Sequence, residues 1–382
     1  MKKLEKIITR DKSVISGKKN LEHLFTFNDF PIYMGCTDEK FEDDICLDMK
    51  WAIDPETGMI QLMDLVPLEI LYSKQHMDST GPTWDEYNDL LANFISKEVK
   101  GDIIEIGGGS GKLAIKVLDR LNNKINYTIV EPNPLISESK NLKITRDFFS
   151  SKIENPSNRI HTVVLSQVLE HAYNPEEFLL EIRKYLPENG KFVFGYPNLE
   201  YFFSNKHTNA INFEHTLLMT DYFVEFFLKK TGFKLLKKEN FKNHSFFYSV
   251  QKSAFDKIDK PDKNNYLKFK TMFNDFINHH EKMIKKLNYE IDNHDGEIFL
   301  FGAHIFSQYL IGFGLSVEKI NSILDNSPIK IGKRLYGTEL MVQSPQCLSK
   351  FEKPLVILKA GVYNDEIKTD ILTNINSKTK FI

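Results

Sequence analysis

The chain has 382 residues, of which 41% are hydrophobic, and this length suits two or three domains with ordinary cores. The formal net charge of −2 at pH 7 argues against a large electrostatic attraction to nucleic acid or to an anionic membrane. The three cysteines make no disulfide framework, no apolar run reaches the ~18 residues of a membrane span, and the charged first residues show no signal peptide, so we expect a cytoplasmic protein.

The first 100 residues are predicted to form an extension made of a hairpin and a helix. Residues 48–62 read as two short strands around a turn at Asp54–Gly58, which contains a proline and a glycine. Residues 83–99 carry apolar side chains at helical spacing, with Thr83 as the expected N-cap.

Residues 101–250 alternate between strand patterns and helical patterns. Short runs rich in β-branched and aromatic residues occur at 102–107, 126–132, 161–167 and 190–197. Helical patterns lie between them, as in residues 174–186. This alternation is typical of a parallel sheet with helices on both faces, so the expected fold class is α/β with a Rossmann-like domain.

Residues 251–290 are predicted to form a helical linker, because residues 264–287 contain no glycine or proline and carry a helical apolar stripe. Residues 291–382 are predicted to form a second, smaller α/β domain. Strand patterns followed by turn residues return there at 297–304, 320–327 and 354–361.

The stretch "IIEIGGGSGK", residues 103–112, has four glycines in five positions after an apolar run, so its backbone must turn sharply or approach something closely. A P-loop is excluded, because Ile106 stands at the first glycine position and Leu113 at the Ser/Thr position. The dinucleotide fingerprint G-x-G-x-x-G also fails, since Lys112 takes the place of the third glycine.

Two carboxylates accompany these glycines. Glu105 ends the strand before the glycine-rich stretch, and Glu131 ends the next strand, twenty residues after Gly111. Because the loop matches neither phosphate-binding motif, the two side chains suit a ligand that has a cationic amino-acid end and a ribose but no pyrophosphate. Glu131 can accept hydrogen bonds from both ribose hydroxyls, and Glu105 can hold the amino group through water.

This arrangement resembles the first two motifs of the S-adenosylmethionine-dependent methyltransferases with a Rossmann-like fold. The resemblance implies S-adenosylmethionine as the cofactor, held by Glu105, Gly107, Gly109, Gly111 and Glu131. It also implies that Asp147 lies near the adenine amino group. Ser166 and Gln167, in "SQVLEH", would then lie beside the methyl-bearing sulfur.

Three further stretches resemble the sugar C-methyltransferases that act on nucleotide-linked deoxysugars. Residues 59–76 look like that family's segment of glutamine-leucine, proline-glutamate and tyrosine, and residues 212–233 look like its Y-H-E-H segment. The chain from Phe301 onwards is similar to the family's C-terminal Rossmann-like domain. The resemblance implies a small, sugar-type acceptor in the biosynthesis of a surface polysaccharide.

The sequence departs from this family at its zinc site. The family commonly holds zinc with two C-x-x-C pairs, whereas this chain has only Cys36 and Cys46, and Asp54 and Thr57 stand at the second pair. Because soft thiolate ligands are missing, we expect no metal. The hairpin is expected to be held by packing alone.

His215 is the best candidate for the catalytic base, with Glu214 to orient it. His76 is a second candidate, because the resemblance puts its segment over the mouth of the site, and His171 is expected to be structural. Three residues are candidates for substrate binding: Tyr196 and Asn198, at the carboxyl end of the fifth strand, and Asn212.

One difference from the sugar C-methyltransferase family bears on which atom is methylated. The tyrosine of the family's Y-H-E-H segment is Asn212 here, and its neighbouring histidine is Phe213. Asparagine cannot give up a proton near neutral pH, so O-methylation is slightly favoured over C-methylation of a keto-deoxysugar. A small-molecule O- or N-methyltransferase and a non-catalytic ligand-binding protein stay as alternatives, and the oligomeric state is open.

Overall fold

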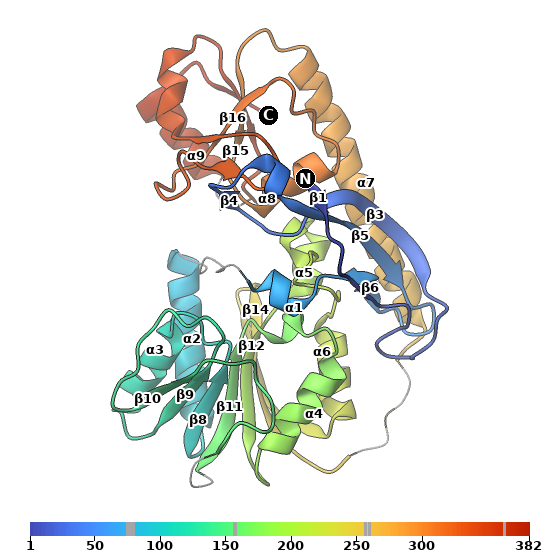
Figure 1. Cartoon of the computed structure of the whole chain (residues 1–382), viewed down its shortest axis with the longest axis vertical. Helices are drawn as coiled ribbons and strands as arrows, with labels where there is room; N and C mark the ends of the chain where they lie inside the picture. The colour runs from blue at the N-terminus through green and yellow to red at the C-terminus, as the bar shows by residue number, and fades with distance from the viewer. Residues whose placement is uncertain (74–80, 156–158, 256–257, 259–260, 362–363) are drawn as a thin grey trace. The chain divides into compact units, whose positions relative to one another are not determined.

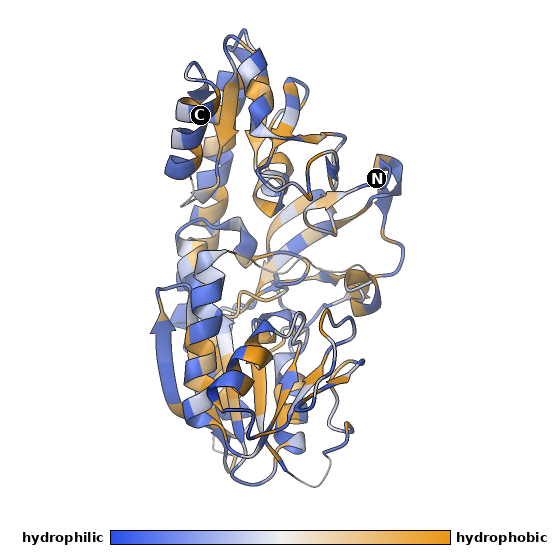
Figure 2. Cartoon of the chain, turned by 90° about the vertical axis from the view of Figure 1, so that its left-hand side faces the viewer, coloured by the Kyte–Doolittle hydropathy of each residue, from blue (hydrophilic) through white to orange (hydrophobic). Residues whose placement is uncertain are grey.

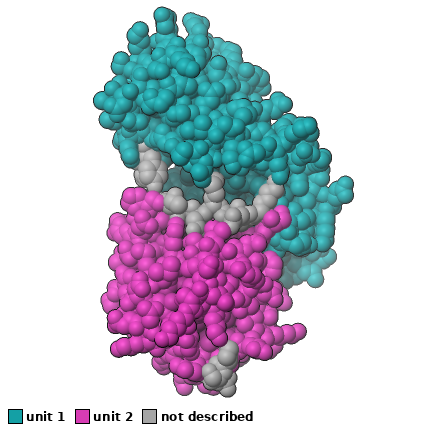
Figure 3. All heavy atoms as spheres, turned by 60° about the vertical axis from the view of Figure 1, so that its left-hand side comes forward, with its two compact units in different colours: residues 1–71, 202–213, 263–382 teal, residues 72–201, 214–262 magenta. Residues whose placement is uncertain are grey.

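The computed structural model describes residues 1–73, 81–155, 159–255, 258, 261–361 and 364–382. The chain divides into two compact units, which have different colours in Figure 3. Unit 1 comprises residues 1–71, 202–213 and 263–382, and unit 2 comprises residues 72–201 and 214–262. The sequence predicted four consecutive segments instead, because local patterns indicate elements but not which distant segments pack together.

Unit 2 is built on one sheet. Its strands are β8 (Asp102–Ile106), β9 (Tyr127–Val130), β10 (Leu142–Thr145), β11 (Ile160–Ser166), β12 (Lys191–Pro197), β13 (Phe233–Phe241) and β14 (Ser245–Lys252). Their spatial order is β10–β9–β8–β11–β12–β14–β13 (Figure 1). The five strands from β10 to β12 are parallel, and β14 runs antiparallel to both of its neighbours. This confirms the predicted Rossmann-like α/β fold.

Helices cover both faces of this sheet, with α2 (Pro82–Glu98) and α3 (Lys112–Arg120) on one face and α4 (Pro175–Tyr185) and α6 (Asp221–Lys230) on the other (Figure 1). A 3-10 turn, η3 (Leu169–His171), follows β11. The apolar stripe predicted for α2 is buried against the sheet, as the sequence indicated. The helix begins after Gly81 rather than at Thr83, because Pro82 suits the first helical position.

Three strands of unit 2, which are β10, β13 and β14, were not predicted from the sequence. β10 is a four-residue edge strand with one buried residue, so it shows no long alternation. β13 carries exposed lysines and leucines at the other edge of the sheet. The basic residues of this run thus belong to an edge strand of the sheet.

Unit 1 contains two main sheets. The N-terminal sheet contains β1 (Lys2–Lys3), β3 (Glu22–Pro31), β5 (Ile45–Ile53) and β6 (Ile60–Leu62). The C-terminal sheet contains β15 (Ile298–Phe301), β16 (Ile320–Leu324), β18 (Val342–Gln343), β19 (Leu355–Leu358) and β20 (Lys380–Phe381), and all of its pairs are parallel. Two small antiparallel pairs join β2 (Ile8–Thr9) to β7 (Asp64–Leu65) and β4 (Cys36–Thr37) to β17 (Arg334–Leu335).

The helices of unit 1 are α1 (Leu68–Leu71), α7 (Asn264–Asp292), α8 (Ile305–Gly312) and α9 (Asn364–Asp370). Shorter helical turns occur at Phe41–Asp43, Thr208–Ala210, Pro345–Lys350 and Ile371–Ile375, and α5 (Leu199–Ser204) lies where the chain passes from unit 2 to unit 1. The helix predicted in the linker is α7, and it packs within unit 1 as part of its core.

Aromatic side chains join the two sheets of unit 1. Phe27 and Phe30 of β3 pack against Tyr309 of α8, with ring centroids 5.4 and 4.8 Å apart. The buried hydroxyl of Tyr309 donates to the carbonyl of Ile211. The hairpin therefore buries its apolar face against the C-terminal part of the chain, which explains why both belong to one unit.

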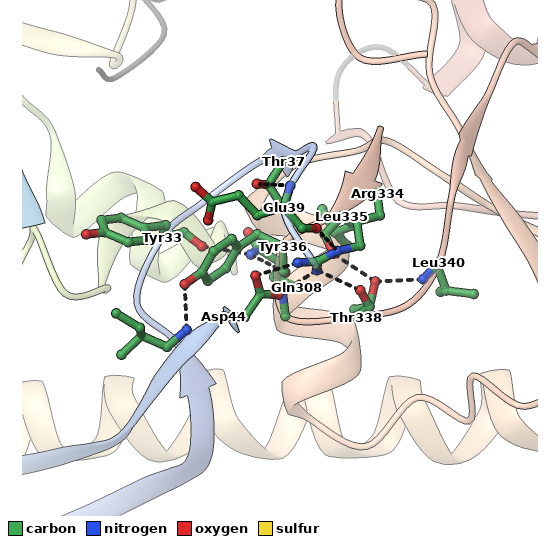
Figure 4. Close-up of polar contacts among 12 residues, drawn as sticks. Tyr33, Thr37, Glu39, Asp44, Gln308, Arg334, Leu335, Tyr336, Thr338 and Leu340 are labelled. Carbon is green, nitrogen blue, oxygen red and sulfur yellow. Dashed lines mark hydrogen bonds and ion pairs between the residues drawn. The ribbon is translucent and has the colours of Figure 1, made fainter. Parts of the chain in front are cut away.

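A buried ion pair also joins these parts (Figure 4). The guanidinium of Arg334 donates two hydrogen bonds, of 2.5 and 2.6 Å, to the two carboxylate oxygens of Asp44. The backbone N–H of Gly337 donates to the same carboxylate at 2.7 Å. The two charges thus neutralise each other, although the residues that carry them are 290 positions apart in sequence.

The turn of the N-terminal hairpin is held by hydrogen bonds around Asp54, which corrects the expectation that packing alone holds it. The carboxylate of Asp54 is fully buried and accepts from the hydroxyls of Ser13, at 2.5 Å, and Thr57, at 2.8 Å. It also accepts from the N–H of Glu56. The hydroxyl of Ser13 in turn accepts from the N–H groups of Ile15 and Ser16, so it stabilises the preceding loop.

The hydropathy of the chain follows this architecture. The strands of unit 2 are largely coloured as hydrophobic in Figure 2, whereas hydrophilic colour dominates many helical turns and loops. Within the described parts of the chain, no helix combines the length and the hydropathy that a membrane crossing requires.

Candidate active site

The glycine-rich loop connects β8 to α3 at the carboxyl edge of the parallel sheet. Gly107, Gly109 and Gly111 have φ angles of 75°, 44° and 72°, which favour glycine. A Cβ on Gly107 would come within 2.6 Å of Val168, and one on Gly111 would come within 2.4 Å of Ile136. The loop is therefore a tight backbone turn that leaves no room for side chains at these two positions.

Glu131, directly after β9, holds this loop in place. One carboxylate oxygen accepts from the N–H of Gly109 at 3.3 Å, and the other accepts from the N–H of Asn133 at 3.0 Å. Each oxygen keeps a second lone pair that a ligand hydroxyl could use. The structure thus brings Glu131 next to the glycines, as the resemblance implied.

Glu105 lies beneath the loop, with only 1% of its surface exposed. Its carboxylate accepts from the hydroxyl of Tyr127 at 3.0 Å. Burial raises the pKa of Glu105 to about 7, although the hydrogen bond from Tyr127 opposes the shift. A cation near this carboxylate would favour its ionised form.

Asp147 lies two residues beyond the end of β10, which pairs with β9, the strand that Glu131 follows. Its carboxylate is exposed and accepts from the N–H of Phe148 at 2.7 Å. The ring of Phe148 is itself 50% exposed. An exposed aromatic ring beside an acidic residue at this edge offers an apolar surface for a flat heterocycle, and sequence reasoning missed it.

Ser166 and Gln167 stand at the carboxyl end of β11, in the middle of the sheet. Gln167 has a φ of 55°, which is unusual for a residue with a side chain. Its amide donates to the hydroxyls of Tyr87, at 3.0 Å, and Ser245, at 3.2 Å. The hydroxyl of Tyr87 also lies 3.2 Å from that of Ser166. Tyr87, which is completely buried on α2, therefore positions both residues.

A group of titratable side chains lies next to this edge. Nδ1 of His171 lies 2.7 Å from the hydroxyl of Tyr72 and 3.6 Å from a carboxylate oxygen of Glu214. The rings of His171 and His215 pack edge to face, with centroids 5.1 Å apart. The structure thus brings His171 next to Tyr72, Glu214 and His215.

Burial governs the electrostatics of this group. Burial, and then the charge of Glu214, raise the pKa of Tyr72 well above its ordinary value, so the tyrosine is a neutral hydroxyl at physiological pH. The backbone carbonyl of Tyr72 accepts from the side-chain amide of Asn133 at 3.2 Å. Because the N–H of Asn133 also donates to Glu131, which accepts from Gly109, Tyr72 is connected to the glycine-rich loop by a chain of three hydrogen bonds.

Three other predicted residues have different surroundings. Tyr196 is fully buried and its hydroxyl donates to the carbonyl of Met219 at 2.6 Å, so its expected contact with substrate is corrected to a role in the core. The side chain of Asn198 accepts from the N–H of Tyr201 and thereby caps α5. Asn212 is buried in unit 1, where its amide donates to the carbonyl of Asn209. His76 lies outside the described residues.

Sequence reasoning missed Tyr72 and Tyr87 as parts of the site and assigned His171 a structural role. Tyr72 was noted only within a longer motif, and Tyr87 only as part of an apolar stripe. Their partners are about 80 to 100 residues away, so no local spacing could indicate these contacts. The one feature that could have indicated a polar contact was the hydroxyl of Tyr87 on the apolar face of α2, because a buried tyrosine hydroxyl needs a hydrogen-bond partner.

The family model described as a methyltransferase domain matches residues 82–246, which include the glycine-rich loop, Glu131, Gln167 and His215. No curated protein matches the chain in sequence.

Several solved structures are similar to part of the chain. The CurJ carbon methyltransferase is 16% identical over 44% of this chain and 54% of its own, with a TM-score of 0.35. An O-methyltransferase family protein from Burkholderia thailandensis is 14% identical over 45% of this chain and 57% of its own, with a TM-score of 0.34. Human N-acetylserotonin methyltransferase, solved with S-adenosylmethionine, is 16% identical over 44% of this chain and 52% of its own, with a TM-score of 0.36. The chain therefore spans about half the length of each.

The residues at the carboxyl edge of unit 2 fit S-adenosylmethionine. The positive φ angles of the glycines allow a close approach to the backbone, and Glu131 has acceptor capacity left for ribose hydroxyls. Glu105 is a buried carboxylate close to this loop that can favour a cationic amino group. The match of the family model to these same residues completes the assignment. Residues 82–246 therefore form an S-adenosylmethionine-dependent methyltransferase domain.

Proposed function

We propose that this enzyme methylates an oxygen of a sugar or sugar-like acceptor, which is nucleotide-linked, in the biosynthesis of a surface polysaccharide. The observation that supports the proposal most is the group formed by Tyr72, His171, Glu214 and His215 in the methyltransferase unit. A hydroxyl acceptor needs one base and polar groups that hold the neighbouring oxygens, and this group offers both. The acceptor class rests on the resemblance of three sequence stretches to sugar methyltransferases.

The cofactor supplies a methyl group on a sulfonium, which is already a good leaving group, so the protein has to position the acceptor and remove its proton. In the proposed mechanism His215 accepts the proton from the acceptor hydroxyl. The carboxylate of Glu214, which lies 3.6 Å from His171, stabilises the positive charge that forms on the pair of imidazoles. Tyr72 donates to an acceptor oxygen or to His171 and fixes the orientation of that ring. His76 stays a second candidate base, and Asn198 and Asn212 stay candidates for acceptor binding.

C-methylation of a keto sugar is the second candidate, and one observation favours it. A neutral tyrosine hydroxyl next to a histidine is suited to stabilise an enolate oxygen, and Tyr72 and His171 form such a pair. An enolate mechanism requires the base to remove a proton from carbon before the methyl group arrives. The two candidates therefore differ in a step that can be observed without the methyl donor.

The test is a turnover screen against nucleotide sugars, with the methylated atom located by NMR. His215→Ala should lower the methyl-transfer rate by ~10²–10⁴ and leave S-adenosylmethionine affinity nearly unchanged. His161→Ala is the control, because His161 lies near the amino end of β11, away from the edge that carries the site. Methylation of carbon, with base-dependent deuterium exchange from D₂O in the absence of donor, would refute O-methylation. A lack of turnover on every sugar would refute the acceptor class.

A further inference from the structure

Three side chains of the site form a set of metal ligands. One carboxylate oxygen of Glu170 and one ring nitrogen each of His171 and His215 lie within 4.8 Å of one another. Glu170 and His171 are neighbours in η3, and His215 comes from the segment before α6. All three belong to unit 2, so the arrangement does not depend on how the two units are placed.

Glu170 has no part in the proposed methyl transfer, and its environment is unusual. The residue is 2% exposed, and among the described residues its oxygen Oε2 has no hydrogen-bond partner. A buried carboxylate oxygen that lacks a donor is unfavourable, and the carboxylate of Glu214 adds further negative charge nearby. A cation bound beside Glu170 would relieve both effects.

The geometry is close to that of a bound metal. Imidazole nitrogens and carboxylate oxygens bind Zn²⁺ at about 2.0–2.2 Å, so two ligand atoms of a tetrahedral site lie about 3.4 Å apart. Ligand atoms within 4.8 Å of one another need to approach by at most about 1.4 Å, which side-chain rotations achieve. Two imidazoles and one carboxylate form a donor set that suits Zn²⁺, Co²⁺ or Fe²⁺ rather than Mg²⁺ or Ca²⁺.

We propose that Glu170, His171 and His215 bind one divalent transition-metal ion, and that this ion inhibits methyl transfer. The inhibition follows from chemistry already described, since a nitrogen of His215 that is bound to a metal cannot accept a proton from the acceptor. The inhibitory part rests on the proposed function of His215, whereas the binding part does not. The ion is thus a regulator of the site and not a cofactor of the reaction.

The binding test uses the full-length protein after treatment with EDTA. Titration with Co²⁺ should give absorption bands typical of a low-coordinate site at one ion per chain, and Zn²⁺ should displace Co²⁺. Glu170→Gln should weaken Co²⁺ binding at least tenfold, because the amide has lost the charge. Glu188→Gln, at an 82% exposed side chain, is the matched control and should bind like the wild type.

A second measurement on the wild-type protein does not depend on the folding of a variant. Proton NMR of the Co²⁺-bound protein should show two exchangeable imidazole N–H signals with large hyperfine shifts, one for each histidine. Their absence, or Co²⁺ binding that is unchanged in Glu170→Gln, would overturn the proposed site.

The inhibition test measures methyl transfer with Zn²⁺ alone as the probe. Zn²⁺ should suppress turnover of the wild type at the concentration at which it displaces Co²⁺, and EDTA should restore it. Glu170→Gln, compared with its own metal-free rate, should need at least tenfold more Zn²⁺. Stimulation by Zn²⁺ would refute the inhibitory role. If Co²⁺ binds at the three residues but no sugar is methylated, the proposed function fails while the metal site stands.

Discussion

The hydroxyl of Tyr72 lies 2.7 Å from Nδ1 of His171, and the backbone carbonyl of the same tyrosine accepts from Asn133, beside Glu131. Tyr72 therefore joins the proposed acid–base group to the proposed cofactor site. We predict that Tyr72→Phe lowers the methyl-transfer rate about fivefold, the effect of losing one hydrogen bond of about 1 kcal/mol. The affinity for S-adenosylmethionine should not change, because the backbone carbonyl stays.

The control for Tyr72→Phe is Tyr222→Phe, which removes a partly exposed hydroxyl on α6 that accepts from the N–H of Asp262. Both variants are compared by single-turnover rates and by calorimetric titration with cofactor. An equal rate in the wild type and in Tyr72→Phe would show that the hydroxyl has no role in the reaction.

Glu131→Ala should weaken S-adenosylmethionine binding by about 1–3 kcal/mol, because the substitution removes an ionised acceptor. The loss includes the hydrogen bonds that the carboxylate accepts from Gly109 and Asn133, so the loop becomes less ordered as well. Isothermal titration calorimetry measures the change, and Glu188→Ala at the amino end of β12 serves as the control. An affinity equal to that of the wild type would contradict the assignment of the cofactor site.

The affinity for S-adenosylmethionine should rise with pH through about pH 7. The pKa of Glu105 in the free protein is raised to about 7 by burial, so the side chain is half protonated there. A bound ammonium group favours the carboxylate, so binding releases a proton below pH 8 and weakens as the pH falls. Calorimetry in buffers of different ionisation enthalpy detects this proton, and Glu105→Gln should bind with no such dependence. Proton release that persists in Glu105→Gln would assign it to another group.

The raised pKa of Glu105 also affects stability. The folded protein binds a proton that the unfolded chain releases near its ordinary pKa of about 4.3, so the contribution of Glu105 to stability is fully present below that pH. This contribution is lost as the pH rises to about 7. The melting temperature of Glu105→Gln should therefore depend less on pH between 5 and 8 than that of the wild type.

Asp54→Ala should loosen the turn of the N-terminal hairpin, because the buried carboxylate accepts from Ser13, Thr57 and Glu56. Losing hydrogen bonds to a charged group costs about 1.5–3 kcal/mol, which corresponds to amide exchange faster by about 10- to 100-fold. Hydrogen exchange at the backbone amides of Gly58 and Met59 measures this increase in rate, and Asp11→Ala, at an exposed aspartate, is the control. EDTA should leave the exchange of the wild type unchanged. Faster exchange on chelation would show that a metal, and not the hydrogen bonds, holds the turn.

The sequence indicated which residues of the proposed cofactor site lie together, but it did not indicate the contacts around His171. Glu105, the glycines and Glu131 lie on two neighbouring strands and the turn between strand and helix, so short spacings in one α/β segment are enough to place them. The contact between Tyr72 and His171 joins residues 99 positions apart, and the ion pair of Asp44 and Arg334 joins residues 290 positions apart. Such contacts depend on tertiary packing, which periodicity does not encode. For the same reason the sequence indicated strands and helices of unit 1 but not that its N-terminal hairpin packs on its C-terminal sheet.

The discontinuity of unit 1 has a consequence for how the protein is made. Residues 1–71 pack with residues 263–382, whereas residues 72–201 and 214–262 form the other unit. On a ribosome that adds about 5–20 residues per second, the hairpin is synthesised many seconds before the partner that covers Phe27 and Phe30. During that interval its apolar face has no native cover. A messenger truncated after the methyltransferase segment would therefore yield a chain whose first 71 residues lack the partner that completes their unit.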